Sequence, residues 1–126
     1  MERFLWICFA GALGCGTRYL VTLWAAERFG VAFPYGTLIV NLVGCFAISL
    51  VMHLALGITT FSPTLRLALT AGFLGGLTTY SSFNYETMKL FGDGAIGLAA
   101  LNFGVTTVGG FVAGLGGLAL ARTLVG

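Results

Sequence analysis

Residues 71–86 read AGFLGGLTTYSSFNYE, and this stretch decides the fold. It lies within the third of four apolar segments, where an uninterrupted transmembrane helix would otherwise be expected. The adjacent glycines Gly75 and Gly76 are unfavourable in the middle of a helix, as is the β-branched pair Thr78 and Thr79. The stretch therefore predicts a broken helix. Inside a membrane, a broken backbone is tolerated only where protein or water satisfies its polar groups.

The rest of the chain has the composition of a membrane protein. Hydrophobic residues make up 58% of its 126 residues and charged residues 8%, whereas a soluble domain carries about 25% charged residues. The net charge of +2 gives no indication of nucleic-acid binding. A membrane helix needs about 20 mostly apolar residues, so we expect a single all-α domain with four transmembrane helices. Their predicted spans are approximately 4–26, 35–58, 63–90 and 95–123.

Positive charges are balanced between the two sides of the predicted bundle. Four spans place both termini and the middle loop on the same side of the membrane. The two sides then carry three positive residues each: Arg3, Arg66 and Arg122 against Arg18, Arg28 and Lys89. Orientation normally follows an excess of Lys and Arg on one side. Either another signal orients this chain, or it inserts in both orientations and forms an antiparallel, dual-topology homodimer.

Polar side chains in the second and fourth spans share helix faces. Thr37 and Asn41 are four residues apart, as are Asn102 and Thr106, and residues at this spacing lie on one face. Hydrogen bonds between packed helices explain these pairs as well as a polar lining does. Small residues at the same spacing in the fourth span favour close helix packing: Gly109, Gly110, Ala113, Gly114 and Gly117.

Hydrogen-bond donors follow the predicted break. Ser81, Ser82 and Asn84 come directly after it, and Tyr80 and Phe83 share a helix face. Two aromatic residues at this spacing are also typical of core packing. A lining rich in donors and poor in acids suits an anion.

Glu86 is the only acid deep in a predicted span. Lys89 follows three residues later and is placed to form an ion pair with it, so Glu86 has a structural as well as a functional interpretation. The sequence contains no nucleophile–base pair, phosphate-binding loop or metal-ligand cluster, and we do not expect an enzyme.

Together these motifs resemble the Fluc (CrcB-type) family of fluoride channels. The most specific match is GGLTTYSSF at residues 75–83. GCGTRY at residues 14–19, TLIVNLVG at residues 37–44 and an Asn-x-x-x-Thr-x-x-x-Gly pattern from Asn102 to Gly110 extend it over all four spans. The resemblance implies an antiparallel homodimer with two fluoride-selective pores. It also implies passive fluoride export across the bacterial inner membrane, as a defence against fluoride toxicity.

The resemblance further implies roles for single residues. A structural Na⁺ at the dimer centre would be bound by the backbone carbonyls of Gly75 and Thr78, and Asn41 would donate to fluoride or its water near a pore mouth. Tyr80 and Phe83 occupy the positions of two pore phenylalanines, and the tyrosine departs from the family pattern in a way that affects the expected conduction rate. The resemblance also places five polar residues along the fluoride pathway: Thr37, Ser81, Ser82, Glu86 and Thr106. Arg18 is implied to lie in the vestibule as a positive attractor or a structural anchor.

Two other functions are compatible with a small membrane protein. A proton-coupled multidrug transporter with four spans and dual topology needs a membrane-buried acid in its first helix, but residues 4–26 contain neither Asp nor Glu. A non-transporting assembly subunit would have no reason to break its third helix beside a cluster of hydroxyl groups. The sequence therefore favours the channel.

Overall fold

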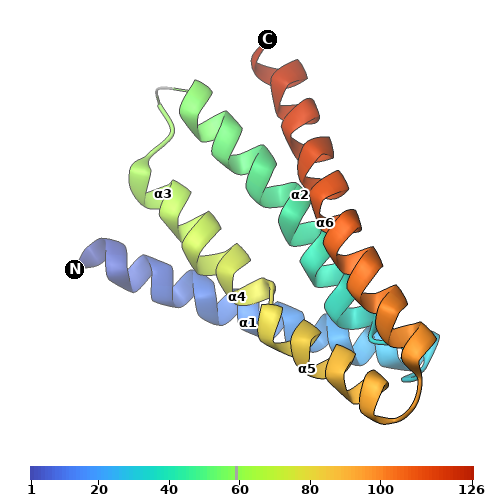
Figure 1. The fold of residues 1–126 in the computed structure, drawn as a ribbon. Coiled ribbons are helices and arrows are strands. Elements are labelled where there is room, and N and C mark those ends of the chain that lie inside the picture. Colours follow the sequence, from blue (N-terminus) through green and yellow to red (C-terminus); the bar gives the residue numbers. More distant parts are fainter. Residues whose placement is uncertain (59) are drawn as a thin grey trace.

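The computed structural model describes residues 1–58 and 60–126, which form helices joined by short connections (Figure 1). Three helices are long and apolar enough to cross a membrane, namely α1 (Glu2–Phe29), α2 (Tyr35–Gly57) and α6 (Ile96–Val125). The segment between α2 and α6 consists of shorter pieces: α3 (Pro63–Leu67), the π-helical η1 (Ala68–Leu74), α4 (Gly75–Leu77) and α5 (Tyr80–Gly92). The described part of the chain contains no strand.

Large apolar side chains cover the outside of the helices. Phe111 is 76% exposed and Trp24 is 52% exposed, while Asn102 and Thr87 are buried. This distribution is the reverse of that in a water-soluble protein, where large apolar residues are mostly buried. It matches a protein whose outer surface contacts lipid and whose polar groups bond to one another inside.

The ends of α1 and α2 follow from local sequence. Helix α1 continues past the predicted end of its apolar span, through Glu27 and Arg28 to Phe29. A cation in the last turn is favourable because the helix C-terminus carries partial negative charge. Gly30 then takes φ +83°, which only glycine adopts readily, and turns the chain toward Pro34 before α2 begins.

The third apolar segment is interrupted at the threonine pair, whereas Gly75 and Gly76 remain helical in α4. Ser62 caps α3 by accepting a hydrogen bond from the Leu65 N–H at 3.3 Å. Helix α4 ends at Leu77, and the next two residues, Thr78 and Thr79, have extended ψ angles of 155° and 109°. Thr79 then caps α5 by accepting from the Ser82 N–H at 3.1 Å.

Close helix contacts depend on glycine. A Cβ atom added to Gly14 of α1 would collide with the Phe73 carbonyl in η1, and one added to Gly117 of α6 would collide with the Phe46 carbonyl in α2. Helices α2 and α6 lie side by side along most of their length (Figure 1). The packing interpretation of the small residues in the fourth span is therefore confirmed.

The connections alternate between two ends of the molecule. Arg3 Nε at the start of α1 donates to Thr64 Oγ1 in α3 at 3.4 Å, and Gly57 at the end of α2 lies against Val125 at the end of α6. The α1–α2 and α5–α6 connections lie together at the opposite end (Figure 1). Both termini and the loop after α2 thus belong to the same end, as four alternating segments require.

Candidate functional site

The interruption between α4 and α5 is held by side chains from two other helices. Asn41 on α2 bonds to both backbone groups of Thr79: its Oδ1 accepts from the Thr79 N–H at 2.8 Å and its Nδ2 donates to the Thr79 carbonyl at 3.1 Å. Arg18 on α1 donates from Nε to the Gly76 carbonyl at 3.0 Å. The extended backbone therefore replaces part of its helical hydrogen bonding with bonds to side chains.

Four carbonyls at the interruption, those of residues 75–78, lose their usual donors, and the Gly76 carbonyl accepts from Arg18 instead. In a continuous α-helix the Gly75 carbonyl would accept from the Thr79 N–H, but that N–H donates to Asn41 instead. The Thr78 carbonyl would accept from the Ser82 N–H, which donates to the hydroxyl of Thr79. Carbonyl oxygens freed in this way are typical cation ligands in membrane proteins. The two positions predicted to bind Na⁺ therefore have chemistry that fits it.

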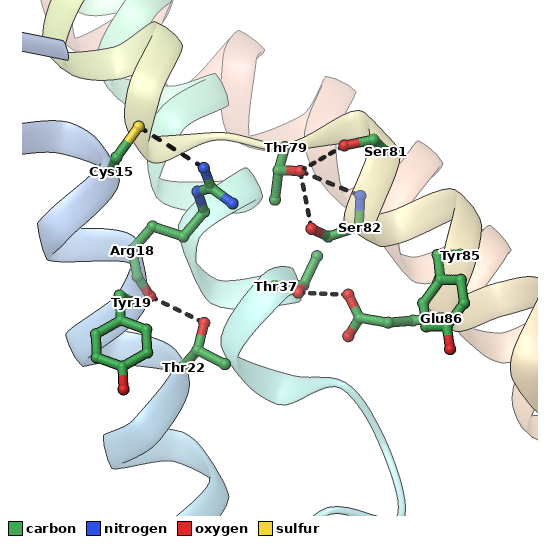
Figure 2. A pocket seen from close by; sticks show the side chains of 10 residues that line it. All are labelled: Cys15, Arg18, Tyr19, Thr22, Thr37, Thr79, Ser81, Ser82, Tyr85 and Glu86. Atoms are coloured by element: carbon green, nitrogen blue, oxygen red, sulfur yellow. Dashed lines mark hydrogen bonds between the residues drawn. The ribbon is translucent and has the colours of Figure 1, made fainter. Parts of the chain in front are cut away.

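A polar cavity of about 700 Å³ opens beside the interruption (Figure 2). The Thr79 hydroxyl lies 3.3 Å from the Ser81 hydroxyl and donates to Ser82 Oγ at 3.0 Å. Ten residues line this cavity, and among them are all but one of the residues predicted for the polar lining and the vestibule: Cys15, Arg18, Tyr19, Thr22, Thr37, Thr79, Ser81, Ser82, Tyr85 and Glu86.

Glu86 takes a different partner from the one its sequence neighbours suggest. It accepts a hydrogen bond at 2.6 Å from the hydroxyl of Thr37 on α2, across the polar cavity (Figure 2). Lys89 pairs with Asp93, with 2.8 Å between Nζ and Oδ2. The structural alternative of a Glu86–Lys89 ion pair is therefore wrong, because each side chain has a better-placed partner.

The second cavity, of about 750 Å³, has a mostly apolar lining that includes aromatic rings and several neutral polar side chains. It brings together four predicted pathway residues: Asn41, Tyr80, Phe83 and Thr106. The Tyr80 and Phe83 rings meet edge to face with centroids 5.6 Å apart. Phe83 is 5% exposed and Tyr80 is 78% exposed, so core packing within one chain describes the first ring and not the second. We call this space the aromatic cavity.

The sequence did not identify one buried link between α5 and α6. Asn102 Nδ2 donates to Thr87 Oγ1 at 2.9 Å, and that hydroxyl donates to the Phe83 carbonyl at 2.7 Å. The helix-packing interpretation of Asn102 is therefore confirmed. The available signal was the four-residue spacing of Phe83 and Thr87, which places a threonine hydroxyl against a carbonyl one turn earlier.

Three cavities follow one another through shared lining residues. An outer cavity of about 420 Å³, near the α1–α2 and α5–α6 connections, shares Thr22, Thr37 and Glu86 with the polar cavity. Thr79 in turn lines both the polar cavity and the aromatic cavity. Asn84 lines none of the three. The site therefore extends from one end of the molecule to the interruption and beyond it.

Comparisons with known proteins give a consistent result. Residues 5–118 match the family described as "CrcB-like protein, Camphor Resistance (CrcB)". A "Fluoride-specific ion channel FluC" from Geotalea uraniireducens (strain Rf4) is 53% identical over 102 residues, covering 81% of this chain and 82% of the relative. A protein of the same name from Anaeromyxobacter sp. (strain K) is 47% identical over 126 residues, covering 100% of both chains. A third, from Citrifermentans bemidjiense, is 45% identical over 124 residues, covering 98% of this chain and 100% of the relative.

Proposed function

Because this chain belongs to the CrcB-like family, we propose that it forms a fluoride channel that lets fluoride leave the cell passively. The chain is a multi-pass bacterial membrane protein. Relatives similar over its whole length are named fluoride-specific ion channels. A channel needs no nucleophile or cofactor chemistry, and its function is not that of an enzyme.

The aromatic cavity is the observation that carries this proposal. Its mostly apolar lining contains the Asn41 amide, the Thr106 hydroxyl and the rings of Tyr80 and Phe83, and it includes no charged side chain. Fluoride is small and strongly hydrated, so a pore has to replace its water with donors. Amide N–H, hydroxyl O–H and the positive edge of an aromatic ring are such donors. Without a fixed cation in the lining, the ion is not held too tightly to leave.

The order of the cavities supports a route for the ion. Fluoride would enter from the outer cavity, pass the Thr37–Glu86 pair and reach the polar cavity, where Arg18 supplies positive charge. Hydroxyl groups of Ser81 and Ser82 line this space. Thr79, which lines two cavities, marks the passage toward the aromatic rings. Arg18 acts here as an attractor at the entrance and as an anchor for the Gly76 carbonyl.

We propose that residues 63–92 form a fourth, broken membrane crossing and that the channel is an antiparallel homodimer. Two residues beside the interruption are exposed in a single chain, namely Gly75 in α4 and Tyr80 in α5. Free backbone carbonyls cannot face lipid without a large cost, and a second chain packed against them would remove that cost. The balanced positive charges support insertion in both orientations.

A structural Na⁺ would be held between the two chains by the Gly75 and Thr78 carbonyls of each. Both carbonyls lack their helical donors, which supports this assignment. When bound, the ion would supply positive charge at the centre of the dimer and neutralise converging carbonyl dipoles. The oxygen-only ligand set suits a hard cation.

Fluoride efflux from liposomes containing the purified protein tests the proposed function. A fluoride electrode should record rapid efflux, with chloride efflux near the protein-free background. Phe83→Ile keeps bulk but removes the ring edge and should abolish most of the fluoride flux. Phe103→Ile is a matched control, because Phe103 stacks on Phe83 at 6.3 Å but does not line the aromatic cavity.

The result that would reject the channel is fluoride efflux equal to that of empty liposomes. Proton-driven drug uptake in the same liposomes would instead favour the small multidrug transporter. Normal flux through Phe83→Ile would leave the channel function intact but reject the assignment of the pathway to the aromatic cavity.

A further inference from the structure

We propose that Asn41 and Arg18 are positioning residues that determine which backbone carbonyls of the interruption remain free for a cation. This inference rests on the proposed function, since it concerns the cation site assigned there to Gly75 and Thr78. It gives Asn41 a second role, separate from its place in the lining of the aromatic cavity.

Asn41 removes the donor that would close the helix over Gly75. The Thr78 N–H still bonds to the Leu74 carbonyl at 3.0 Å, as in a regular helix. The next N–H, that of Thr79, is the first to leave the helical pattern, and Asn41 Oδ1 accepts it at 2.8 Å. The oxygen of the Asn41 amide thus takes the donor that the Gly75 carbonyl would otherwise receive.

Asn41 and Arg18 also donate hydrogen bonds to two other carbonyls of this segment. Asn41 Nδ2 donates to the Thr79 carbonyl at 3.1 Å, and Arg18 Nε donates to the Gly76 carbonyl at 3.0 Å. A carbonyl that accepts from a guanidinium is a poor ligand for a cation, because two positive charges would compete for one oxygen. The charge argument excludes the Gly76 carbonyl, and the Asn41 amide occupies one acceptor site of the Thr79 carbonyl. The carbonyls of Gly75, Leu77 and Thr78 accept no bond from either side chain and stay available.

This arrangement requires partners from two helices distant in sequence. Asn41 comes from α2 and Arg18 comes from α1, and they bond to different carbonyls of the interruption. These bonds oppose a continuous helix, because the segment would have to give them up to form one. Groups that orient metal ligands without touching the metal typically change its affinity by about 10- to 100-fold when they are removed.

The test measures how Na⁺ concentration affects the dimer. Dimer content and thermal stability in detergent are followed as Na⁺ is replaced by a large organic cation. Asn41→Leu should return the Thr79 N–H to the Gly75 carbonyl and raise the Na⁺ midpoint by about tenfold or more. Thr70→Val is the matched control, because its buried hydroxyl bonds only to the Arg66 carbonyl at 2.8 Å, away from the interruption. It should lower stability without moving the Na⁺ midpoint.

Arg18→Met provides a second, independent variant. It leaves the Asn41 bonds in place but releases the Gly76 carbonyl and removes a positive charge. An additional carbonyl favours a larger ion, so the ratio of the K⁺ midpoint to the Na⁺ midpoint should fall by about tenfold.

An unchanged Na⁺ midpoint in Asn41→Leu, with a Na⁺-dependent parent protein, would overturn this inference and leave the cation site standing. A parent dimer indifferent to Na⁺ would reject both the cation site and the inference. If Asn41→Leu gives no folded dimer, Arg18→Met decides, and an unchanged ratio of midpoints then overturns the inference.

Discussion

Tyr80 is the most exposed aromatic residue of α5, at 78%. Its ring meets the edge of the Phe83 ring and lines the aromatic cavity. Compared with phenylalanine, tyrosine adds one heavy atom and a strong O–H donor at the far end of the ring. Both additions act against rapid conduction, since the extra atom narrows the route and a strong donor binds fluoride more tightly. An ion that is bound more tightly leaves more slowly.

Replacing Tyr80 with phenylalanine should therefore increase fluoride efflux. A barrier lowered by about 1 kcal/mol corresponds to a rate increase of about fivefold. Efflux from liposomes is compared for the parent protein and Tyr80→Phe at equal protein density, and selectivity over chloride should not change. Phe91→Tyr serves as the control, because it adds a hydroxyl to a ring of α5 that lines none of the three cavities. Equal or slower flux through Tyr80→Phe would mean that the hydroxyl does not hinder the ion.

At the scale of helices, the contact between α5 and α6 includes a buried series of hydrogen bonds. Asn102 is 1% exposed and donates to the hydroxyl of Thr87, which in turn donates to the Phe83 carbonyl. Thr106 adds a long contact of 3.4 Å to Asn102 Oδ1. These hydrogen bonds hold the turn of α5 that carries Phe83 against α6, so the position of Phe83 in the aromatic cavity depends on helix packing.

Thr87→Val tests this coupling. The substitution keeps the shape of the side chain but leaves a buried Asn102 N–H without its acceptor, which costs about 1–3 kcal/mol. We expect a lower melting temperature together with reduced fluoride flux. Thr87→Ser restores the hydroxyl and should recover both properties. A variant that loses stability but conducts like the parent protein would show that this link supports the helices without positioning Phe83.

For the whole molecule, the proposed antiparallel dimer depends on the charge balance and on the interruption. The sequence assigns three positive residues to each side of the bundle, although Arg18 of the second set lies at the interruption, and no excess selects an orientation. The interruption in the third segment exposes polar backbone that lipid cannot satisfy. In an antiparallel pair each chain would cover the interruption of the other, and the same free carbonyls of both chains would lie opposite one another.

Orientation can be fixed by added charge. A short run of lysines after Gly126 should hold the chain in one orientation, and the same run inserted between Gly92 and Asp93 should hold it in the other, because these positions lie at opposite ends. Neither version alone should conduct fluoride, and coexpression should restore efflux. Normal conduction by one version alone would contradict the antiparallel dimer.

The sequence by itself determined the features that depend on neighbouring residues. Helix ends follow local conformational preferences. Gly30 takes a positive φ after α1, Ser62 caps α3 just before Pro63, and Gly94 takes a positive φ in the turn between α5 and α6. The interruption lies at Thr78 and Thr79, where helix propensity is weak, although the neighbouring glycines Gly75 and Gly76 stay helical. The amount of apolar sequence determined the membrane environment. The motifs indicated the family, because they combine particular residue types at particular spacings in all four spans.

Only the tertiary structure decided which side chains meet. Glu86 had Lys89 within one helical turn, yet it bonds to Thr37 from α2. Asn41 bonds to the Thr79 backbone, and Thr87 links Phe83 to Asn102, although these residues belong to different helices or distant turns. Such partners depend on the rotation and separation of packed helices, which glycine contacts such as those of Gly14 and Gly117 control. Inside a membrane each polar group has to find a partner, and the one it finds is set by the crossing of the helices.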